Sequence, residues 1–180
     1  LYARRQRQMC IRDSSGTDAL LIPLMAKGIG PGDAVITTPF TYIATAEVVS
    51  LLGAEPIFVD IYESTYNINP NGIEKAIQEA ERKGLVAKAI IPVDLFGLPA
   101  RYRLIKDLAK KYGLMVIEDA AQGFGGQIRG QKAGSFGDVA STSFFPAKPL
   151  GCYGDGGAIF TNNEELSLIH ISEPTRRVRI

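Results

Sequence analysis

The residue whose backbone is most restricted is Lys148, which lies between Pro146 and Pro149, shortly after Phe144 and Phe145 at the end of an expected strand. A lysine that is held in place and partly desolvated has a lowered pKa and can form a Schiff base with a carbonyl carbon. Most lysines are instead solvated surface groups, and that interpretation stays open for Lys148 on this pattern alone.

A second candidate is the acidic pair Glu118 and Asp119, which follows a short apolar run and precedes two alanines and Gln122. Two carboxylates at the end of a strand can bind a metal, act as acid and base, or pair with a cation. The small residues after them allow the backbone to approach a flat ligand. The alternative is that Asp119 caps a helix.

Two further segments have the composition of ligand-binding loops. Residues 14–20 (SSGTDAL) place Ser15, Gly16 and Thr17 where a helix begins, which favours a phosphate site or a simple N-cap. Residues 151–157 contain four glycines in seven positions, so their backbone can turn sharply or approach a ligand. Cys152 in that segment has no base nearby in the sequence, which argues against a nucleophile.

The elements that must position these residues alternate along the chain. Apolar, β-branched runs predict strands, and stripes of apolar residues at i, i+3, i+4 and i+7 predict helices. The expected strands are 34–38, 56–61, 87–93 and 114–117, followed by 140–145 and 157–161. The expected helices begin at 17 or 18, at 70 and near 104, the first with a kink at Pro23 and the last ending at Gly113. Residues 123–137 are glycine-rich and predict loop and hairpin. This alternation is typical of an α/β fold with a mostly parallel sheet covered on both faces.

The two ends of the chain have a different origin in our interpretation. Residues 4–13 can be encoded by a DNA sequence that ends in ATGTGTATAAGAGAC, and residues 166–171 can be encoded by CTGTCTCTTATACACATC. The second sequence begins with the reverse complement of ATGTGTATAAGAGACAG, so the two ends can come from opposite strands of one sequence, which resembles a transposase adapter used in library preparation. We therefore expect residues 1–14 and 166–180 to be adapter-derived tails and residues 15–165 to be a partial large domain. A basic, anion-binding pair of tails is the alternative.

The amino-acid composition excludes several classes of protein for this chain. The 180 residues are 46% hydrophobic and 22% charged, which is an ordinary globular balance. Without the tails, Lys+Arg falls from 20 to 13 and Asp+Glu from 19 to 17, a net charge near −4 that argues against nucleic acid and anionic membranes. No apolar run is long enough for a membrane span. One His and two Cys leave too few ligands for a Cys/His metal site, and Cys152, the thiol that remains without the tails, fits a reducing cytoplasm.

Five stretches together resemble the sugar aminotransferases of the DegT/DnrJ type, a pyridoxal-phosphate family of fold type I. These stretches are 14–20, 37–47, 58–61, 118–122 and 142–161. The resemblance implies a three-layer αβα large domain, and it covers essentially all of 15–165. Three departures stand out: the family's small C-terminal domain is absent, Pro23 replaces a helix former, and Gly123 replaces a serine common in the family.

The resemblance also implies a role for each matching residue. Lys148 matches the lysine that binds the cofactor covalently, and Asp119 matches the carboxylate that pairs with its pyridinium nitrogen. Tyr42 matches the aromatic residue that stacks on the ring, and Gln122 matches a side chain beside it. The phosphate contacts match Gly16, Thr17 and Ser143.

The implied reaction moves an amino group, from glutamate by expectation, to a keto group of a nucleotide-linked sugar. The sequence of residues 146–158 is most similar to that of family members that act on a UDP-linked 3-keto-hexuronate for surface polysaccharide or lipopolysaccharide assembly. Alternatives are a dTDP-4-keto-6-deoxy sugar as substrate, the family's dehydratase branch, which has histidine in place of Lys148, and a non-catalytic regulatory homologue. The family further implies a cytoplasmic homodimer with shared sites, and the span 15–165 alone is expected to be inactive.

Overall fold

The computed structural model describes residues 9–163 and Leu166, and for residues 9–13 it describes the backbone alone. Nine strands are present in this part of the chain. They are β1 (Met9–Asp13), β2 (Asp33–Thr37), β3 (Glu55–Phe58), β4 (Val86–Ile90), β5 (Met115–Asp119), β6 (Gln127–Ile128), β7 (Gln131–Lys132), β8 (Val139–Ser143) and β9 (Gly157–Thr161). Seven of them form one sheet in the order β1-β9-β8-β5-β4-β2-β3, in which β3, β2, β4, β5 and β8 run parallel. The strand β9 is antiparallel to β8, and β6 and β7 form a separate hairpin.

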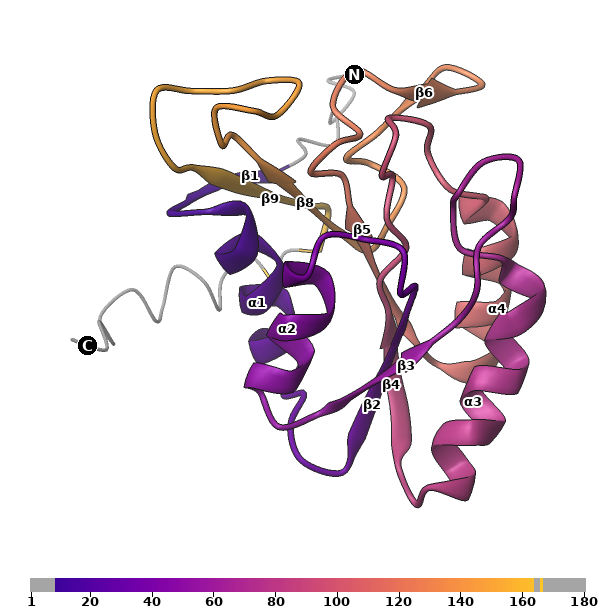
Figure 1. The fold of residues 1–180 in the computed structure, drawn as a ribbon. Helices are drawn as coiled ribbons and strands as arrows, with labels where there is room; N and C mark the ends of the chain where they lie inside the picture. Colours follow the sequence, from indigo (N-terminus) through magenta and orange to yellow (C-terminus); the bar gives the residue numbers. More distant parts are fainter. Residues whose placement is uncertain (1–8, 164–165, 167–180) are drawn as a thin grey trace, which may run out of the picture.

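Helices cover both faces of this sheet (Figure 1). The helices are α1 (Gly16–Ala26), α2 (Ala44–Leu51), α3 (Ile73–Arg82) and α4 (Tyr102–Tyr112), with a short 3-10 turn, η1 (Pro70–Gly72), before α3. The pair α1 and α2 lies on one face, and α3 and α4 lie on the other. The prediction of a three-layer α/β fold with a mostly parallel sheet is therefore confirmed.

Alternation along each central strand produces two separate cores. Ile36 of β2 and Ile90 of β4 face α3 and α4, whereas their neighbours Val35 and Ala89 face α1 and α2. All four side chains are fully buried. Successive strand residues point to opposite faces, so the parts of a strand that are covered on both sides need apolar residues at every position, as residues 34–36 and 89–91 have.

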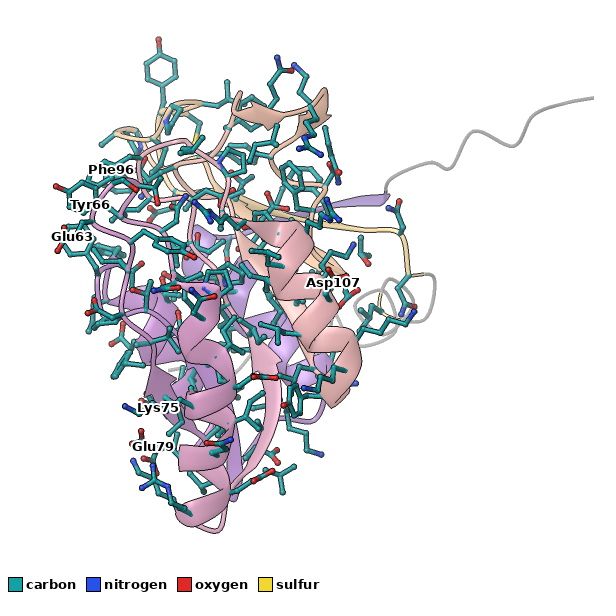
Figure 2. The ribbon with its side chains drawn as sticks, turned by 90° about the vertical axis from the view of Figure 1, so that its right-hand side faces the viewer. Glu63, Tyr66, Lys75, Glu79, Phe96 and Asp107 are labelled. Atoms are coloured by element: carbon teal, nitrogen blue, oxygen red, sulfur yellow. The ribbon has the colours of Figure 1, made fainter. Side chains whose placement is uncertain are left out.

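The helices on the α3–α4 face show the expected amphipathic division. Ile73, Ala76, Ile77 and Ala80 of α3 are buried in the core, while Figure 2 shows Lys75 and Glu79 on the outward side of α3 and Asp107 on α4. The predicted end of α4 at Gly113 is confirmed, because this residue has φ of +68° and forms the C-cap.

Two local predictions differ from the structure. The helix α2 was not expected, because its N-cap Ile43 makes no side-chain capping bond and its eight residues carry no start signal. The helix expected from Pro70 begins as η1 and becomes α-helical only at Ile73. Proline at the first position and Asn69 as cap both agree with the prediction that a turn begins there.

The strand β1 lies within the segment that we assign to the N-terminal tail. It pairs with β9 along its whole length, from Met9 opposite Thr161 to Asp13 opposite Gly157. Backbone pairing on the free edge of β9 requires only an extended segment without proline, so it does not depend on what encoded these residues. The adapter origin stays a prediction, and residues 1–8 and 167–180 lie outside the described part of the chain.

In the ranges that the structure describes, no helix has both the length and the apolar character needed to cross a bilayer.

Candidate functional site

A cavity of about 690 Å³ lies where the carboxyl ends of β2, β4, β5 and β8 meet. Its wall combines the first turn of α1, the loop before α2, the end of β5 and the loop after β8. The seven residues predicted for the site all line it. They are Gly16, Thr17, Tyr42, Asp119, Gln122, Ser143 and Lys148.

Asp119 is the buried acid of this cavity, with 4% of its surface exposed. Its Oδ2 accepts a hydrogen bond of 2.9 Å from Thr45 Oγ1, and its Oδ1 accepts one of 3.1 Å from the N–H of Ala121. Burial raises the pKa of Asp119, and the two hydrogen bonds and the charge of Lys148 oppose that rise. In the described residues β5 is followed by a turn and then β6, with no helix between them, so Asp119 caps a turn and not a helix, and it also lines the cavity.

Glu118 does not share the site with Asp119, although the two residues are adjacent. It is fully buried on the other face of the sheet, where its carboxylate accepts hydrogen bonds from the N–H groups of Gly134, Phe136 and Gly137. Neighbouring residues of a strand point to opposite faces, so the open alternatives of a shared metal site or an acid–base pair do not apply to these two carboxyls.

The loop that carries Lys148 is fixed by backbone hydrogen bonds. The N–H of Lys148 donates to Phe145 O at 2.8 Å, the N–H of Cys152 donates to Phe144 O at 2.8 Å, and the N–H of Phe144 donates to Gly156 O at 2.7 Å. Lys148 itself is half-buried. This loop gives the side chain a defined direction, unlike that of a freely solvated lysine.

Lys148 and Asp119 approach the cavity without pairing directly. Within the described residues they form no ion pair, although the positive charge of Lys148 lowers the pKa of Asp119. The Nζ atom of Lys148 lies 5.7 Å from the centroid of the Tyr42 ring. An amine, a carboxylate and an aromatic face thus converge on one space.

The first turn of α1 packs directly against the end of β8. A Cβ atom at Gly16 would lie 2.5 Å from Ser143 Cβ and 2.8 Å from Ser143 Oγ, so only glycine permits this approach. Ser15 is the N-cap, and its side chain accepts from the N–H of Asp18. The first N–H groups of a helix have no partners within it, so Gly16 and Thr17 present donors and the positive end of the helix dipole beside Ser143. This is a suitable arrangement for an anion such as a phosphate.

Aromatic side chains extend the wall of the cavity to the surface. Phe40 lines the cavity and stacks on Tyr66 at 5.4 Å between centroids, and Phe96 meets the Tyr66 ring edge-on at 5.5 Å. Figure 2 shows Tyr66 and Phe96 together at the rim of the molecule. These three residues come from the loops after β2, β3 and β4, and their separation in the sequence hid them from the sequence analysis.

Thr45 is the main functional residue that the sequence analysis missed. Its hydroxyl is buried, donates to Asp119, and lies 2.9 Å from the hydroxyl of Thr41. The signal that identifies it is a helix beginning at Ala44, since the first turn of α2 turns Thr45 toward β5. Because α2 itself was not expected, this contact was not expected either.

The chain is similar in sequence to a family of known proteins. Residues 2–171 match the DegT/DnrJ/EryC1/StrS aminotransferase family. A UDP-2-acetamido-2-deoxy-3-oxo-D-glucuronate aminotransferase of Pseudomonas aeruginosa is 56% identical over 158 residues, 88% of this chain and 42% of the relative. A protein of Geobacillus stearothermophilus named a pleiotropic regulatory protein is 50% identical over 153 residues, 85% of this chain and 40% of the relative.

The fold is similar to that of a solved structure as well. A DegT DnrJ EryC1 StrS aminotransferase from Brucella abortus superposes with a TM-score of 0.88 and 55% identity, over 91% of this chain and 44% of that protein. The chain spans less than half the length of these relatives.

Replacing Thr45 by valine tests its support of Asp119. The change keeps the side-chain shape and removes the donor, so it should lower the free energy of unfolding by about 1–3 kcal/mol at neutral pH. The loss should shrink at acidic pH, because protonated Asp119 needs that donor less. Urea titrations measure both values. Thr41→Val, whose hydroxyl contacts Thr45 but not Asp119, should cost less; equal stability of Thr45→Val and the wild type at all pH values would contradict the assignment.

Proposed function

This chain belongs to the DegT/DnrJ/EryC1/StrS aminotransferase family, and on that premise we propose that its cavity binds pyridoxal 5′-phosphate for amino transfer to a nucleotide-linked sugar. The observation that carries the proposal is the convergence of Asp119, Lys148 and the first turn of α1 on one cavity. Each offers what one part of the cofactor requires: an anion for the ring nitrogen, an amine for the aldehyde, and N–H donors for the phosphate.

The residues present fit this cofactor in size and in charge. A volume of about 690 Å³ lies in the usual range for small-molecule sites. The close contact of Gly16 with Ser143 leaves the helix N-terminus free to receive a phosphate. Asp119 is desolvated and has a raised pKa, so a cationic ring nitrogen stabilises its charged form.

When bound, the pyridine ring withdraws electrons from the carbon that loses its proton. Asp119 keeps the ring nitrogen protonated, and Thr45 and Ala121 hold the carboxylate in place while it does so. Lys148 would hold the cofactor through its amine, and the same amine could serve as general base and acid. Tyr42 covers one side of the cavity near Lys148, and Gln122 contributes to its wall.

For the substrate, we propose a UDP-linked 3-keto-hexuronate with glutamate as amino donor, in surface polysaccharide or lipopolysaccharide assembly. Support comes from the Pseudomonas aeruginosa relative, whose name specifies such a sugar. A dTDP-4-keto-6-deoxy sugar is the alternative substrate. A regulatory role, as the name of the Geobacillus stearothermophilus relative indicates for that protein, accounts less well for Lys148 and Asp119 lining one cavity.

Two further parts of the proposal concern the whole protein. We propose a homodimer, because Phe40, Tyr66 and Phe96 are large apolar side chains left exposed near the cavity. We propose a cytoplasmic location, because the exposed free thiol of Cys152 fits a reducing compartment. The adapter-derived tails and the partial large domain between them also remain part of this proposal.

The covalent role of Lys148 is tested by trapping. When the chain is incubated with pyridoxal phosphate and reduced with borohydride, the peptide that contains Lys148 should gain the mass of the cofactor. Lys148→Ala should abolish this label, because it removes the amine that attaches the cofactor. Lys132→Ala, which removes an exposed lysine on β7, is the matched control and should label normally. A label spread evenly over surface lysines, unchanged in Lys148→Ala, would argue against the site.

The charge of Asp119 is tested on the ring nitrogen itself. In Asp119→Asn the carboxylate is lost at nearly constant shape, so the bound ring should lose its proton at neutral pH while attachment to Lys148 persists. The ¹⁵N chemical shift of ring-labelled cofactor reports this protonation directly. Asp107→Asn, which changes an exposed acid on α4, should leave the shift unchanged. A protonated ring in Asp119→Asn would remove Asp119 from the proposed role.

Substrate choice is tested in the protein completed to the length of its relatives. Turnover of a UDP-linked 3-keto-hexuronate should exceed that of a dTDP-4-keto-6-deoxyhexose by about tenfold or more in kcat/KM, a difference of about 1.4 kcal/mol. Steady-state rates with glutamate as donor measure the ratio. The reverse order would favour the alternative sugar, and no turnover of either with intact cofactor attachment would favour a regulatory role.

A further inference from the structure

A second group of buried acids lies behind the cavity, on the face of the sheet covered by α4. Asp94, in the loop after β4, is fully buried, as is Glu118 of β5. The two side chains are neighbours, because Tyr102 donates to Asp94 and stacks on Phe136 at 4.8 Å between ring centroids, and the N–H of Phe136 donates to Glu118. Neither residue belongs to the wall of the cavity, and the proposed function uses neither of them.

The two oxygens of Asp94 have different surroundings. Oδ1 accepts two hydrogen bonds of 2.9 Å, one from the N–H of Ala100 and one from the hydroxyl of Tyr102. Oδ2 is buried and receives no donor from the described residues. A Cβ atom at Gly123 would lie 3.1 Å from this oxygen, so the turn after β5 packs tightly beside it. A buried carboxylate oxygen without a donor is costly, and a protonated oxygen is not.

The surroundings of Glu118 favour its ionised form in the pair that it makes with Asp94. Its Oε1 accepts from the N–H of Gly134 at 2.5 Å, and its Oε2 accepts from Phe136 at 2.7 Å and from Gly137 at 3.3 Å. Burial raises the pKa of Glu118, and the three N–H donors and Asp94 oppose that rise, so these donors stabilise the carboxylate form. When two carboxyls are in contact and one is held as the anion, the other must supply the proton between them.

We propose that Asp94 carries a proton at neutral pH and donates it from Oδ2 to Glu118, so that the two acids share one negative charge. The proton connects the loop after β4 to the loop at 134–137 through Glu118. The backbone continues this connection to the site, because the N–H of Asp94 donates to Asp119 O at 3.0 Å and the N–H of Asp119 donates to Pro92 O at 2.9 Å. Asp94 is thus a positioning residue for the end of β5.

The electrostatic environment agrees with this assignment. Burial and the charge of Glu118 raise the pKa of Asp94 to about 8, and the hydrogen bonds from Ala100 and Tyr102 oppose the rise. The ionisable groups that act on Asp94 are Tyr102 of α4 and Glu118 and Asp119 of β5, and all three are acids. None supplies a positive charge that would favour ionised Asp94.

The proton leaves a signature in the pH dependence of stability. The unfolded chain releases the Asp94 proton near its ordinary pKa of 3.8, whereas the folded chain keeps it up to about 8. Between these values the folded state binds more protons, so stability must fall as the pH rises. One such proton changes the folding equilibrium constant by up to about tenfold per pH unit.

Asp94→Asn is the diagnostic change, because the amide copies a protonated carboxyl: its oxygen accepts from Ala100 and Tyr102, and its NH₂ donates to Glu118. Urea titrations of the 180-residue chain from about pH 5 to pH 9 measure how the free energy of unfolding depends on pH. The free energy of unfolding of Asp94→Asn should fall less with rising pH than that of the wild type, and it should be the higher of the two near pH 9. Asp94→Ala should be less stable than Asp94→Asn at every pH. Asp107→Asn is the control, since it removes an exposed acid on α4 and should keep the wild-type slope.

Infrared spectroscopy of the wild-type chain provides an independent measurement. A carbonyl stretch of a protonated carboxyl should be present at neutral pH and absent in Asp94→Asn. If this band is missing, if Asp94→Asn keeps the wild-type slope, or if it fails to fold, the shared proton is wrong. Neither measurement uses the cofactor, so this outcome is independent of the proposed function.

Discussion

The site depends on holding the carboxylate of Asp119 where water does not reach it. Burial opposes its charge, and the two hydrogen bonds from Thr45 and Ala121 only partly offset that cost. The charge of Lys148 acts in the same direction but forms no ion pair with it in the described part of the chain. A cation on the cavity side of Asp119 would therefore stabilise its carboxylate further. A ligand with a positive end would therefore be favoured at this side of the cavity.

The rest of the fold serves to bring distant segments to this carboxylate. Parallel strands deliver their carboxyl ends to one edge, so loops from positions as far apart as Tyr42 and Lys148 meet there. The contact of Gly16 with Ser143 then places the start of α1 at the same edge. An anion site and a cation-seeking acid thus occupy one cavity, and a zwitterionic ligand can satisfy both ends at once.

The sequence predicted those parts of the fold that depend on periodicity. The central strands and the helices α3 and α4 have unbroken apolar patterns, and β9 was predicted within its observed bounds. The helix α2 has neither a capping side chain nor the length to show a pattern, so it was missed together with Thr45. The opposite directions of Glu118 and Asp119 follow from strand geometry alone, but only once the strand is known to include both. The contact between Asp94 and Glu118 is long-range, and only the packing of β4 beside β5 reveals it.

The strand β5 ends in two buried acids, Glu118 and Asp119, and the charge of each is stabilised from a different side of the sheet. Facing α4, Glu118 accepts three N–H donors, and in our proposal it also accepts the proton of Asp94. Facing the cavity, Asp119 accepts two donors, and in our proposal a ligand supplies its positive partner. Because the two acids share one backbone, the position of Asp119 relative to a bound ring depends on how firmly the acids behind the sheet hold that strand.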